Sequence, residues 1–314
     1  MPGAPLAGRR IVVTGGAGFI GAHVARDLRM AGAKVVVADL ARSSDHDVAS
    51  MRLDLRTRGV AAAVVTPGVD AVVHLAAATS VLRSVDRPAE TFENNVSVTS
   101  ALLEQARRVS LRTFVFASTN AVVGQAAHFP IHERTSLAPL TPYGATKAAA
   151  EMLLSSYTEA YGLRGVSLRF TNVYGPGMGR KDSVIPRLVK AARAGHTFHV
   201  YGDGSQVRDY VYVSDVVAAV RRALVDERWR GPVVIGSGAS TSVLDVAAMV
   251  REVSGVDIAL HHVAPKPGEM AKVVVDPSHA QVLGWRPTTS LYEGLQRVWQ
   301  TWAAGSLRPV TVGP

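Results

Sequence analysis

Tyr143 and Lys147 stand four residues apart in the segment YGATK, in a chain that contains no cysteine. Residues at i and i+4 of a helix share one face. An ammonium group there stabilises a phenolate and lowers the pKa of the phenol from its reference value of about 10. The spacing predicts a tyrosine that can act as a base, although one Tyr-x-x-x-Lys match says little without its neighbours.

A hydroxyl residue is expected beside this pair. The segment ASTNAVVG (117–124) ends a predicted strand, and YGATK opens the following helix, twenty-four residues after Thr119. In a parallel sheet both segments emerge at the carboxyl edge, where nucleotides bind. We therefore expect Thr119, Tyr143 and Lys147 to lie together next to a nucleotide.

The nucleotide is predicted by a glycine-rich turn. In TGGAGFIG (14–21), Gly15, Gly18 and Gly21 follow an apolar strand and open a helix. Such a turn lets the backbone approach a diphosphate and directs a helix N-terminus at its charge. A glycine-rich turn without further purpose is the alternative, and the strand before it and the helix after it count against that reading.

Two acidic residues refine the choice of nucleotide. Asp39 ends the next strand, eighteen residues after Gly21, where a carboxylate can accept both ribose hydroxyls and would repel a 2′-phosphate. This position favours NAD over NADP, although the nearby Arg42 softens the preference. Asp54 is expected beside the adenine after a third strand, and a solvated turn is an equally good interpretation of Asp54 from the pattern alone.

These residues need a particular scaffold. Apolar strand patterns alternate with helical patterns through residues 10–170, which is typical of a doubly wound α/β fold with a Rossmann-type parallel sheet. Glycine and proline become denser after residue 171. We expect an NAD-binding domain over 1–170, to which the chain returns at 208–236, and a smaller C-terminal substrate-binding lobe over most of 171–314.

Composition excludes several classes of protein. The chain has 314 residues, of which 47% are hydrophobic, so it can bury a full core. No stretch has the roughly eighteen apolar residues of a membrane helix, and the absence of cysteine excludes a disulfide framework. We expect a soluble, unexported protein of the cytoplasm with no membrane partner, although an exported chain without disulfides would have the same composition.

The net charge of +9 does not by itself indicate binding to nucleic acid, and no nucleic-acid partner is expected. Arginines are scattered without aromatic residues between them, which is typical of solvated surfaces. Neither the His261–His262 pair nor His196 with His199 has the further ligand that a metal site needs, so no metal is expected. His74 ends a buried strand and is interpreted as a core residue.

The motifs together resemble the extended short-chain dehydrogenase/reductase family, in particular its nucleotide-sugar epimerases and dehydratases of the UDP-glucose 4-epimerase type. The resemblance extends over nearly the whole chain, through TGGAGFIG, HLAA, ENNV, ASTNAVVG, YGATK, LRFTNVYGPG, VYGDGSQVRDYVYVSD, PGE and LGWRP. It implies NAD as cofactor and a nucleotide sugar, most often a UDP-sugar, as substrate. It also implies a homodimer, formed through helices 91–109 and 145–161.

The resemblance implies roles for individual residues. Tyr143 removes a proton from a sugar hydroxyl, Thr119 hydrogen-bonds the same oxygen, Lys147 binds the nicotinamide ribose, and hydride transfer to NAD⁺ gives a 4-keto sugar. The cofactor contacts are Gly15, Gly18, Phe19, Ile20, Gly21, Asp39, Asp54, Leu55, Leu75, Ala76, Ala77, Asn95, Tyr143 and Lys147. The substrate contacts are Thr79, Ser118, Thr119, Asn120, Asn172, Val184, Arg208, Lys266 and Glu269.

Three of the substrate contacts concern phosphate. Asn172 and Arg208 are implied to hold the diphosphate of the substrate, and an arginine fork suits phosphate geometry. An ion pair between Arg208 and Asp209 is the alternative role for that arginine. Lys266 stands where the family often has arginine, and lysine offers a point charge without the bidentate fork.

The residues after Thr119 discriminate between reactions. Dehydratases of the family place Asp and Glu there, whereas this chain has Asn120 and Ala121, which cannot exchange a proton. Epimerisation at carbon 4 requires only the three catalytic residues and is the leading hypothesis. The alternatives are a UDP-glucuronate decarboxylase, in which Arg180 and Lys181 would meet a carboxylate, a 4-ketosugar reductase that exchanges its cofactor each turn, and a non-catalytic NAD-binding regulator.

Overall fold

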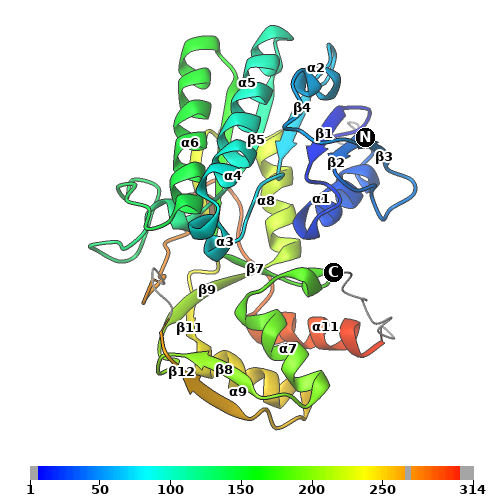
Figure 1. Cartoon of the computed structure of the whole chain (residues 1–314). Helices are drawn as coiled ribbons and strands as arrows, with labels where there is room; N and C mark the ends of the chain where they lie inside the picture. Colours follow the sequence, from blue (N-terminus) through cyan, green and yellow to red (C-terminus); the bar gives the residue numbers. More distant parts are fainter. Residues whose placement is uncertain (1–5, 266–269, 305–314) are drawn as a thin grey trace.

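A seven-stranded parallel sheet forms the upper part of the molecule (Figure 1). The structure, a computed structural model, describes residues 6–265 and 270–304. Every pair of neighbouring strands in this sheet is parallel. From one edge to the other, its strands are β10 (Gly231–Ile235), β6 (Arg164–Phe170), β5 (Thr113–Thr119), β4 (Ala71–His74), β1 (Arg10–Thr14), β2 (Lys34–Asp39) and β3 (Ala49–Arg52).

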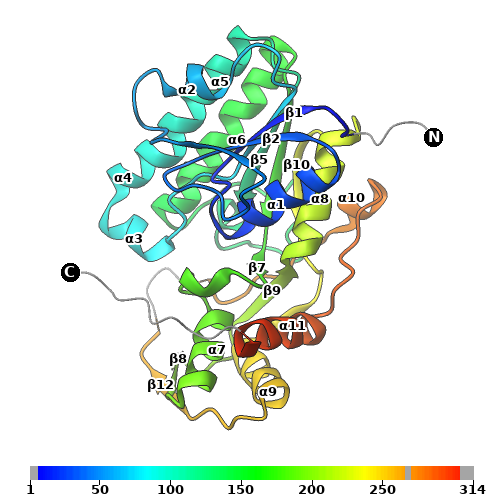
Figure 2. The ribbon, with the colours of Figure 1, turned by 90° about the vertical axis from the view of Figure 1, so that its right-hand side faces the viewer.

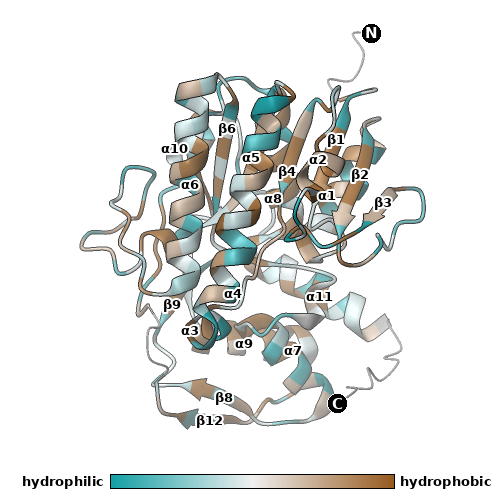
Figure 3. Cartoon of the chain, turned by 45° about the horizontal axis from the view of Figure 1, so that its top comes forward, coloured by the Kyte–Doolittle hydropathy of each residue, from teal (hydrophilic) through white to brown (hydrophobic). Residues whose placement is uncertain are grey.

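The register of the sheet aligns apolar side chains in rows. Val13 of β1 pairs with Val37 of β2 and with Val73 of β4, and all three are fully buried. In β6 every residue is buried. The strands are accordingly coloured mostly as hydrophobic in Figure 3. Strands that are apolar on both faces need cover on both faces.

Helices supply that cover. One face carries α1 (Phe19–Met30) and α8 (Val213–Val225), which contact each other and share a core with Val13. The other face carries α2 (Val60–Val64), α5 (Val98–Arg108) and α6 (Pro142–Tyr161), whose apolar residues pack with those of β1, β4 and β5 that point to that side. Figure 2 shows the two layers on either side of the sheet. The doubly wound α/β class expected from the sequence is confirmed.

The helix expected over 91–109 consists of three successive pieces. These are the end of α4 (Pro88–Phe92), a π-helical turn, η1 (Glu93–Ser97), and α5, which follows without a break; α3 (Val81–Asp86) precedes them. A π-turn inserts one extra residue into a helix and is frequent at functional sites. Here it contains Asn95, one of the residues implied to bind the cofactor.

The remaining elements form a smaller lobe below the sheet (Figure 1). It has a three-stranded sheet of order β11-β9-β7 and a two-stranded sheet of β12 and β8. Its elements are β7 (Asn172–Tyr174), η3 (Met178–Arg180), α7 (Val184–Ala194), β8 (Phe198–Tyr201), β9 (Val207–Tyr212), β11 (Ser240–Ser242), α9 (Val243–Ser254), β12 (Leu260–Val263) and α11 (Leu291–Ala304). Two short pieces lie elsewhere: α10 (Ser278–Val282) contacts β10, and the 3-10 turn η2 (Asn120–Val122) follows β5.

The sequence predicts that the chain returns to the first sheet at residues 208–236. For the strand at the start of this range, β9, that prediction is wrong. β9 pairs in parallel with β7 and antiparallel with β11, so it belongs to the smaller lobe. The return is made by α8, which packs on α1, and by β10, which pairs with β6. A short apolar strand before a helix fits either sheet locally, and only pairing with distant strands decides between them.

Within residues 6–265 and 270–304, none of the helices combines the length and the apolar character needed to cross a membrane.

Candidate active site

A cavity of about 930 Å³ lies between the carboxyl edge of the large sheet and the smaller lobe. Asp39 at the end of β2, Leu75 after β4 and Thr119 at the end of β5 all line it. Asn172 and Arg208 line it from the smaller lobe. The cavity therefore occupies the place where open α/β sheets bind nucleotides, and its volume suits a cofactor together with a substrate.

The glycine-rich turn between β1 and α1 is closed so tightly that side chains do not fit. Gly15 has a φ of +70°, and a Cβ there would lie 2.5 Å from the backbone nitrogen of Ala76. A Cβ at Gly21 would lie 2.1 Å from the carbonyl oxygen of Gly15. Glycine is required at both positions because backbone atoms, which cannot move aside, stand in the way. The predicted contacts of this turn all line the cavity: Gly15, Gly18, Phe19, Ile20 and Gly21.

The features around this turn fit NAD. The first turn of α1 contains no acidic residue, and its N–H groups have no partners within the helix, so it can accept a diphosphate. The two carboxylate oxygens of Asp39 accept hydrogen bonds from the backbone N–H groups of Ala17 (3.0 Å) and Ala41 (3.2 Å). Each oxygen keeps a lone pair for a ribose hydroxyl.

Asp54 and Leu55 line the far end of the same cavity, just after β3, where the adenine contact was predicted. The Asp54 carboxylate pairs with Arg56 at 2.6 Å. Hydrogen bonds from the Arg56 side chain and backbone hold the pKa of Asp54 below its usual range. The carboxylate is therefore charged and fixed in place at neutral pH.

The loop after β4 is fixed by buried polar groups beneath it. His74 lies 2.6 Å from the Thr14 hydroxyl through Nδ1 and 3.0 Å from the Thr99 hydroxyl through Nε2. Burial, together with the charge of Lys147, lowers the pKa of His74 to about 3, so the ring is neutral. His74 is thus a satisfied core residue, as the sequence indicated. Leu75, Ala76 and Ala77 line the cavity next to it.

Asn95 lies behind the loop and does not line the cavity. Its amide accepts a hydrogen bond from the Ala78 N–H (2.8 Å) and donates to the Ala78 carbonyl (3.1 Å) and to the Thr146 hydroxyl (3.0 Å). Asn95 therefore ties the loop after β4 to α6, one residue before Lys147. In the structure, Asn95 therefore positions the loop after β4. The other predicted cofactor contacts all line the cavity.

Thr119, Tyr143 and Lys147 all line the cavity. α6 begins at Pro142, with the Thr141 hydroxyl capping the Gly144 N–H, and this start places Tyr143 and Lys147 on one face. A Cβ at Gly144 would lie 2.6 Å from the Ala121 carbonyl oxygen, so glycine allows the helix to approach the end of β5. The sequence expectation that these three side chains meet is supported by this geometry.

Lys147 is buried and fixed. Its ammonium donates to the Ala117 carbonyl at 2.8 Å and lies 4.7 Å from the centroid of the Phe116 ring. Burial lowers the pKa of Lys147 to about 7, against the charge of Glu151, which raises it.

The pKa of Tyr143 differs from the sequence expectation. Burial raises it to about 12, and a hydrogen bond with Thr119 opposes the rise. The predicted lowering by the Lys147 ammonium is therefore wrong for the protein without its cofactor, because removal from water sets the direction of the shift. A further positive charge in the cavity would lower the pKa of this phenol.

A buried ion pair supports the end of β5. Arg169 of β6 and Glu151 of α6 pair at 2.8 Å, with side chains 4% and 7% exposed. The Ser118 hydroxyl donates to the same carboxylate. Ser118 lines the cavity as predicted, but its hydroxyl is already committed to Glu151. It therefore fixes the strand end that carries Thr119.

The predicted substrate contacts lie around the remainder of the cavity. Thr79, Ser118, Asn120, Asn172, Val184 and Arg208 all line it. Asn172 donates its amide to the Asp209 carbonyl at 3.0 Å. The Asp209 carboxylate accepts hydrogen bonds from Thr171, Ser237 and Gly238. Lys266 and Glu269 lie outside the described residues.

Sequence reasoning missed further lining residues of the smaller lobe. Gln206 and Tyr210 flank Arg208 at a spacing of two, and all three line the cavity. Alternate residues of a strand share a face, so the period of two in GDGSQVRDY was the signal available. Tyr201 and Arg187 also line the cavity.

Among the residues that the structure describes, no group of three or more His, Asp or Glu side chains could hold a metal ion. His199 and His261 face each other across β8 and β12 with ring centroids 5.6 Å apart.

Comparison with known proteins agrees with this geometry. Residues 11–236 match the model of the NAD dependent epimerase/dehydratase family. A putative UDP-glucose 4-epimerase of Methanocaldococcus jannaschii is 33% identical over 92% of this chain and 96% of its own length. The UDP-glucose 4-epimerase of Thermus thermophilus, solved with NAD, is 35% identical with a TM-score of 0.87, covering 95% of this chain and 100% of that one. MoeE5, solved with UDP-glucuronic acid and NAD, is 34% identical with a TM-score of 0.88, covering 94% and 99%.

Proposed function

The chain belongs to the NAD dependent epimerase/dehydratase family, and from this premise we propose that it is an NAD-dependent nucleotide-sugar 4-epimerase. The substrate is a UDP-hexose or a UDP-uronate, the two kinds of ligand or substrate named for the similar proteins. The reaction passes through a transient 4-keto sugar. The observation that carries the proposal is the meeting of Thr119, Tyr143 and Lys147 in the cavity that the glycine-rich turn also lines.

Each of the three catalytic residues has a separate role in the proposed reaction. Tyr143 takes the proton of the sugar 4-hydroxyl, and Thr119 hydrogen-bonds the same oxygen. Lys147, held by the Ala117 carbonyl, presents a fixed donor to the nicotinamide ribose. NAD⁺, when bound, supplies the hydride acceptor and a positive charge that favours the phenolate. Epimerisation then needs only that the keto sugar turn within the cavity before the hydride returns.

Dehydration is disfavoured by the residues after Thr119. Asn120 is buried in the turn η2, and Ala121 follows it. Neither side chain can donate or accept a proton at neutral pH, whereas elimination of water needs an acid and a base beyond the tyrosine. Decarboxylation of a UDP-uronate and reduction of a 4-keto sugar use the same three residues, so they are the alternatives to be tested.

The substrate is identified by following anomeric proton signals by NMR. Purified protein is incubated separately with UDP-glucose, UDP-N-acetylglucosamine and UDP-glucuronate. We expect one of them to give the signals of its 4-epimer until equilibrium is reached, without added NADH. Signals of a UDP-pentose from UDP-glucuronate would indicate decarboxylation instead, and a product seen only with added NADH and a 4-keto sugar would indicate a reductase.

The matched negative substrate in this experiment is dTDP-glucose. We expect no 4-keto-6-deoxy product from it, because the acid and base for elimination are absent. Appearance of that product would refute the argument from Asn120 and Ala121. No change in any of the sugars, with NAD bound, would favour a non-catalytic regulator.

We also propose a homodimer formed through residues 91–109, which comprise the end of α4, η1 and α5, and residues 145–161 of α6. Exposed apolar side chains on α4 and α6 support it, since Phe92 is 52% and Met152 is 66% exposed. Sedimentation at micromolar concentration is expected to show a dimer, and Met152→Asp is expected to shift it toward monomer. Met30→Asp is the matched control, because Met30 is 72% exposed at the end of α1 on the opposite layer. A wild-type protein that sediments only as a monomer would contradict the proposal.

A cytoplasmic location is part of the same proposal. A chain without cysteine suits a reducing compartment.

A further inference from the structure

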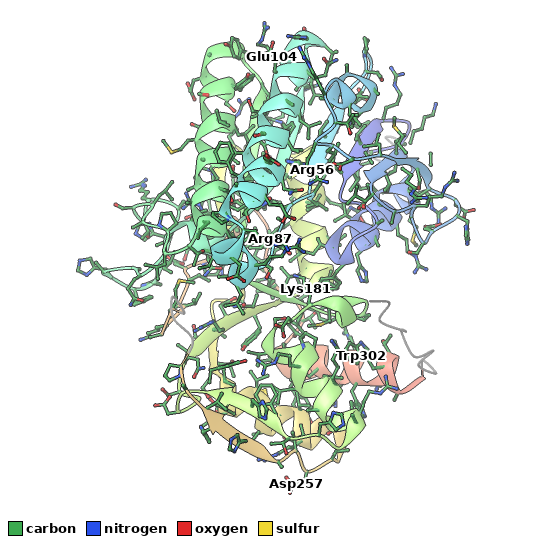
Figure 4. All side chains as sticks on the ribbon, viewed as in Figure 1. Arg56, Arg87, Glu104, Lys181, Asp257 and Trp302 are labelled. Atoms are coloured by element: carbon green, nitrogen blue, oxygen red, sulfur yellow. The ribbon has the colours of Figure 1, made fainter. Side chains whose placement is uncertain are left out.

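Lys181 lies on the segment between β7 and α7, which contacts both halves of the molecule. This connecting segment, residues 176–183, contacts α1 on one side: His23 Nε2 lies 2.9 Å from the Pro176 carbonyl oxygen. On another side it contacts α11, because a Cβ at Gly179 would lie 3.5 Å from the Trp302 ring. Figure 4 shows Lys181 at the level where the upper and lower halves meet, above Trp302. The segment is therefore held between the NAD-binding domain and the last helix of the smaller lobe.

The Lys181 ammonium lacks a counter-charge among the residues that the structure describes. Its cation–π contact there is the ring of Phe19, whose centroid lies 5.4 Å from Nζ. The neighbouring carboxylate, Asp182, pairs instead with Arg187 at 3.7 Å. Lys181 lines the cavity and is partly buried, and burial lowers its pKa. A desolvated cation without an anion is costly, so the site favours a negatively charged ligand.

The position of Phe19 indicates which anion that is. Phe19 is the first residue of α1, so the Lys181 ammonium stands beside the helix turn whose N–H groups lack intrahelical partners. Those N–H groups and the glycine-rich turn are built to receive a diphosphate. An ammonium near them, carried by the smaller lobe, adds a full positive charge.

We propose that Lys181 pairs with the diphosphate of bound NAD, so that the cofactor is held by both halves of the molecule. Release of NAD then requires loss of this contact as well as of those made by the glycine-rich turn. Such retention is what an epimerase needs, because its hydride must return to the same sugar. The inference rests on the proposed function only in that NAD occupies the cavity.

The experiment measures NAD retention without turnover. Holoenzyme is mixed with excess isotopically labelled NAD, and the exchange of bound cofactor is followed in wild type, Lys181→Met and Lys181→Arg. Methionine keeps the length and apolar stem of the side chain. Loss of a charged contact is expected to speed exchange about tenfold to a hundredfold in Lys181→Met, and Lys181→Arg is expected to lie closer to wild type.

Lys190→Met is the matched control, because Lys190 is an exposed lysine on α7 that does not line the cavity. It is expected to exchange NAD within about twofold of wild type. A second control is the affinity of the NAD-free protein for adenosine, which has no phosphate and is expected to bind wild type and Lys181→Met equally. Thermal unfolding of both proteins checks that the variant is folded.

Three outcomes would overturn the proposal. Lys181→Met could exchange NAD at the wild-type rate. It could lose affinity for adenosine as much as for NAD, which would place the effect in the packing of the connecting segment. It could leave NAD unaffected and lower the affinity for UDP-glucuronate, which would make Lys181 a substrate contact. Because each readout is binding, a protein that fails to epimerise any sugar leaves this test intact.

Discussion

Tyr143→Phe is expected to lower the turnover number by about two to four decades, since the variant loses the phenol that we propose takes the proton of the sugar 4-hydroxyl. Burial raises the pKa of this phenol to about 12 in the protein without cofactor. The positive charge of bound NAD⁺ would lower this pKa, whereas phenylalanine cannot take the proton at any pH. Binding of NAD is expected to persist, because the glycine-rich turn and Asp39 are unchanged. Initial rates by NMR and the nucleotide content of the purified variant measure the two effects.

The control for this variant lies on the same helix. Tyr161 ends α6 with 57% of its surface exposed, and Tyr161→Phe is expected to keep the wild-type rate within about twofold. A Tyr143→Phe protein with an undiminished rate would remove the base from the proposed mechanism. Equal losses in both variants would instead indicate damage to α6 as a whole.

The cofactor half of the site could be predicted because its determinants are local. The turn at 14–21 and Asp39 belong to one βαβ unit, and within such a unit the glycines and the strand end have fixed positions relative to each other. The same rule places Thr119 and the start of α6 at one edge of the sheet. Local sequence patterns and the rule that parallel strands present their carboxyl ends at one edge are thus enough to predict where these residues lie.

What could not be predicted depends on distant parts of the chain. Burial of Tyr143 reverses the expected direction of its pKa shift, and the burial comes from elements that spacing does not reveal. Asn95 lies in a π-turn and hydrogen-bonds to Ala78 instead of lining the cavity. The membership of β9 in the smaller lobe, and the position of Lys181 beside Phe19, likewise follow only from tertiary packing.

Glu151→Gln is expected to lower the free energy of unfolding by about 3–5 kcal/mol, the cost of leaving one member of a buried ion pair uncompensated. The Glu151 carboxylate accepts hydrogen bonds from Arg169 Nε and Nη2, and the Ser118 hydroxyl adds another. An amide in its place carries no charge and turns its own N–H groups toward a guanidinium that only donates. Urea denaturation of wild type and variant, extrapolated to water, measures the difference.

Two further variants separate the buried pair from the helix that carries it. Glu159→Gln removes an exposed carboxylate from the same helix and is expected to change stability by less than about 0.5 kcal/mol. Glu151→Met with Arg169→Met replaces the pair by apolar side chains and is expected to recover most of the loss, since the penalty arises from the unpaired charge. A double variant as unstable as Glu151→Gln would show that shape rather than charge is decisive at this position. Turnover is measured in the same double variant. Wild-type stability combined with reduced turnover would indicate that the pair serves to hold Ser118, and with it Thr119, at the end of β5.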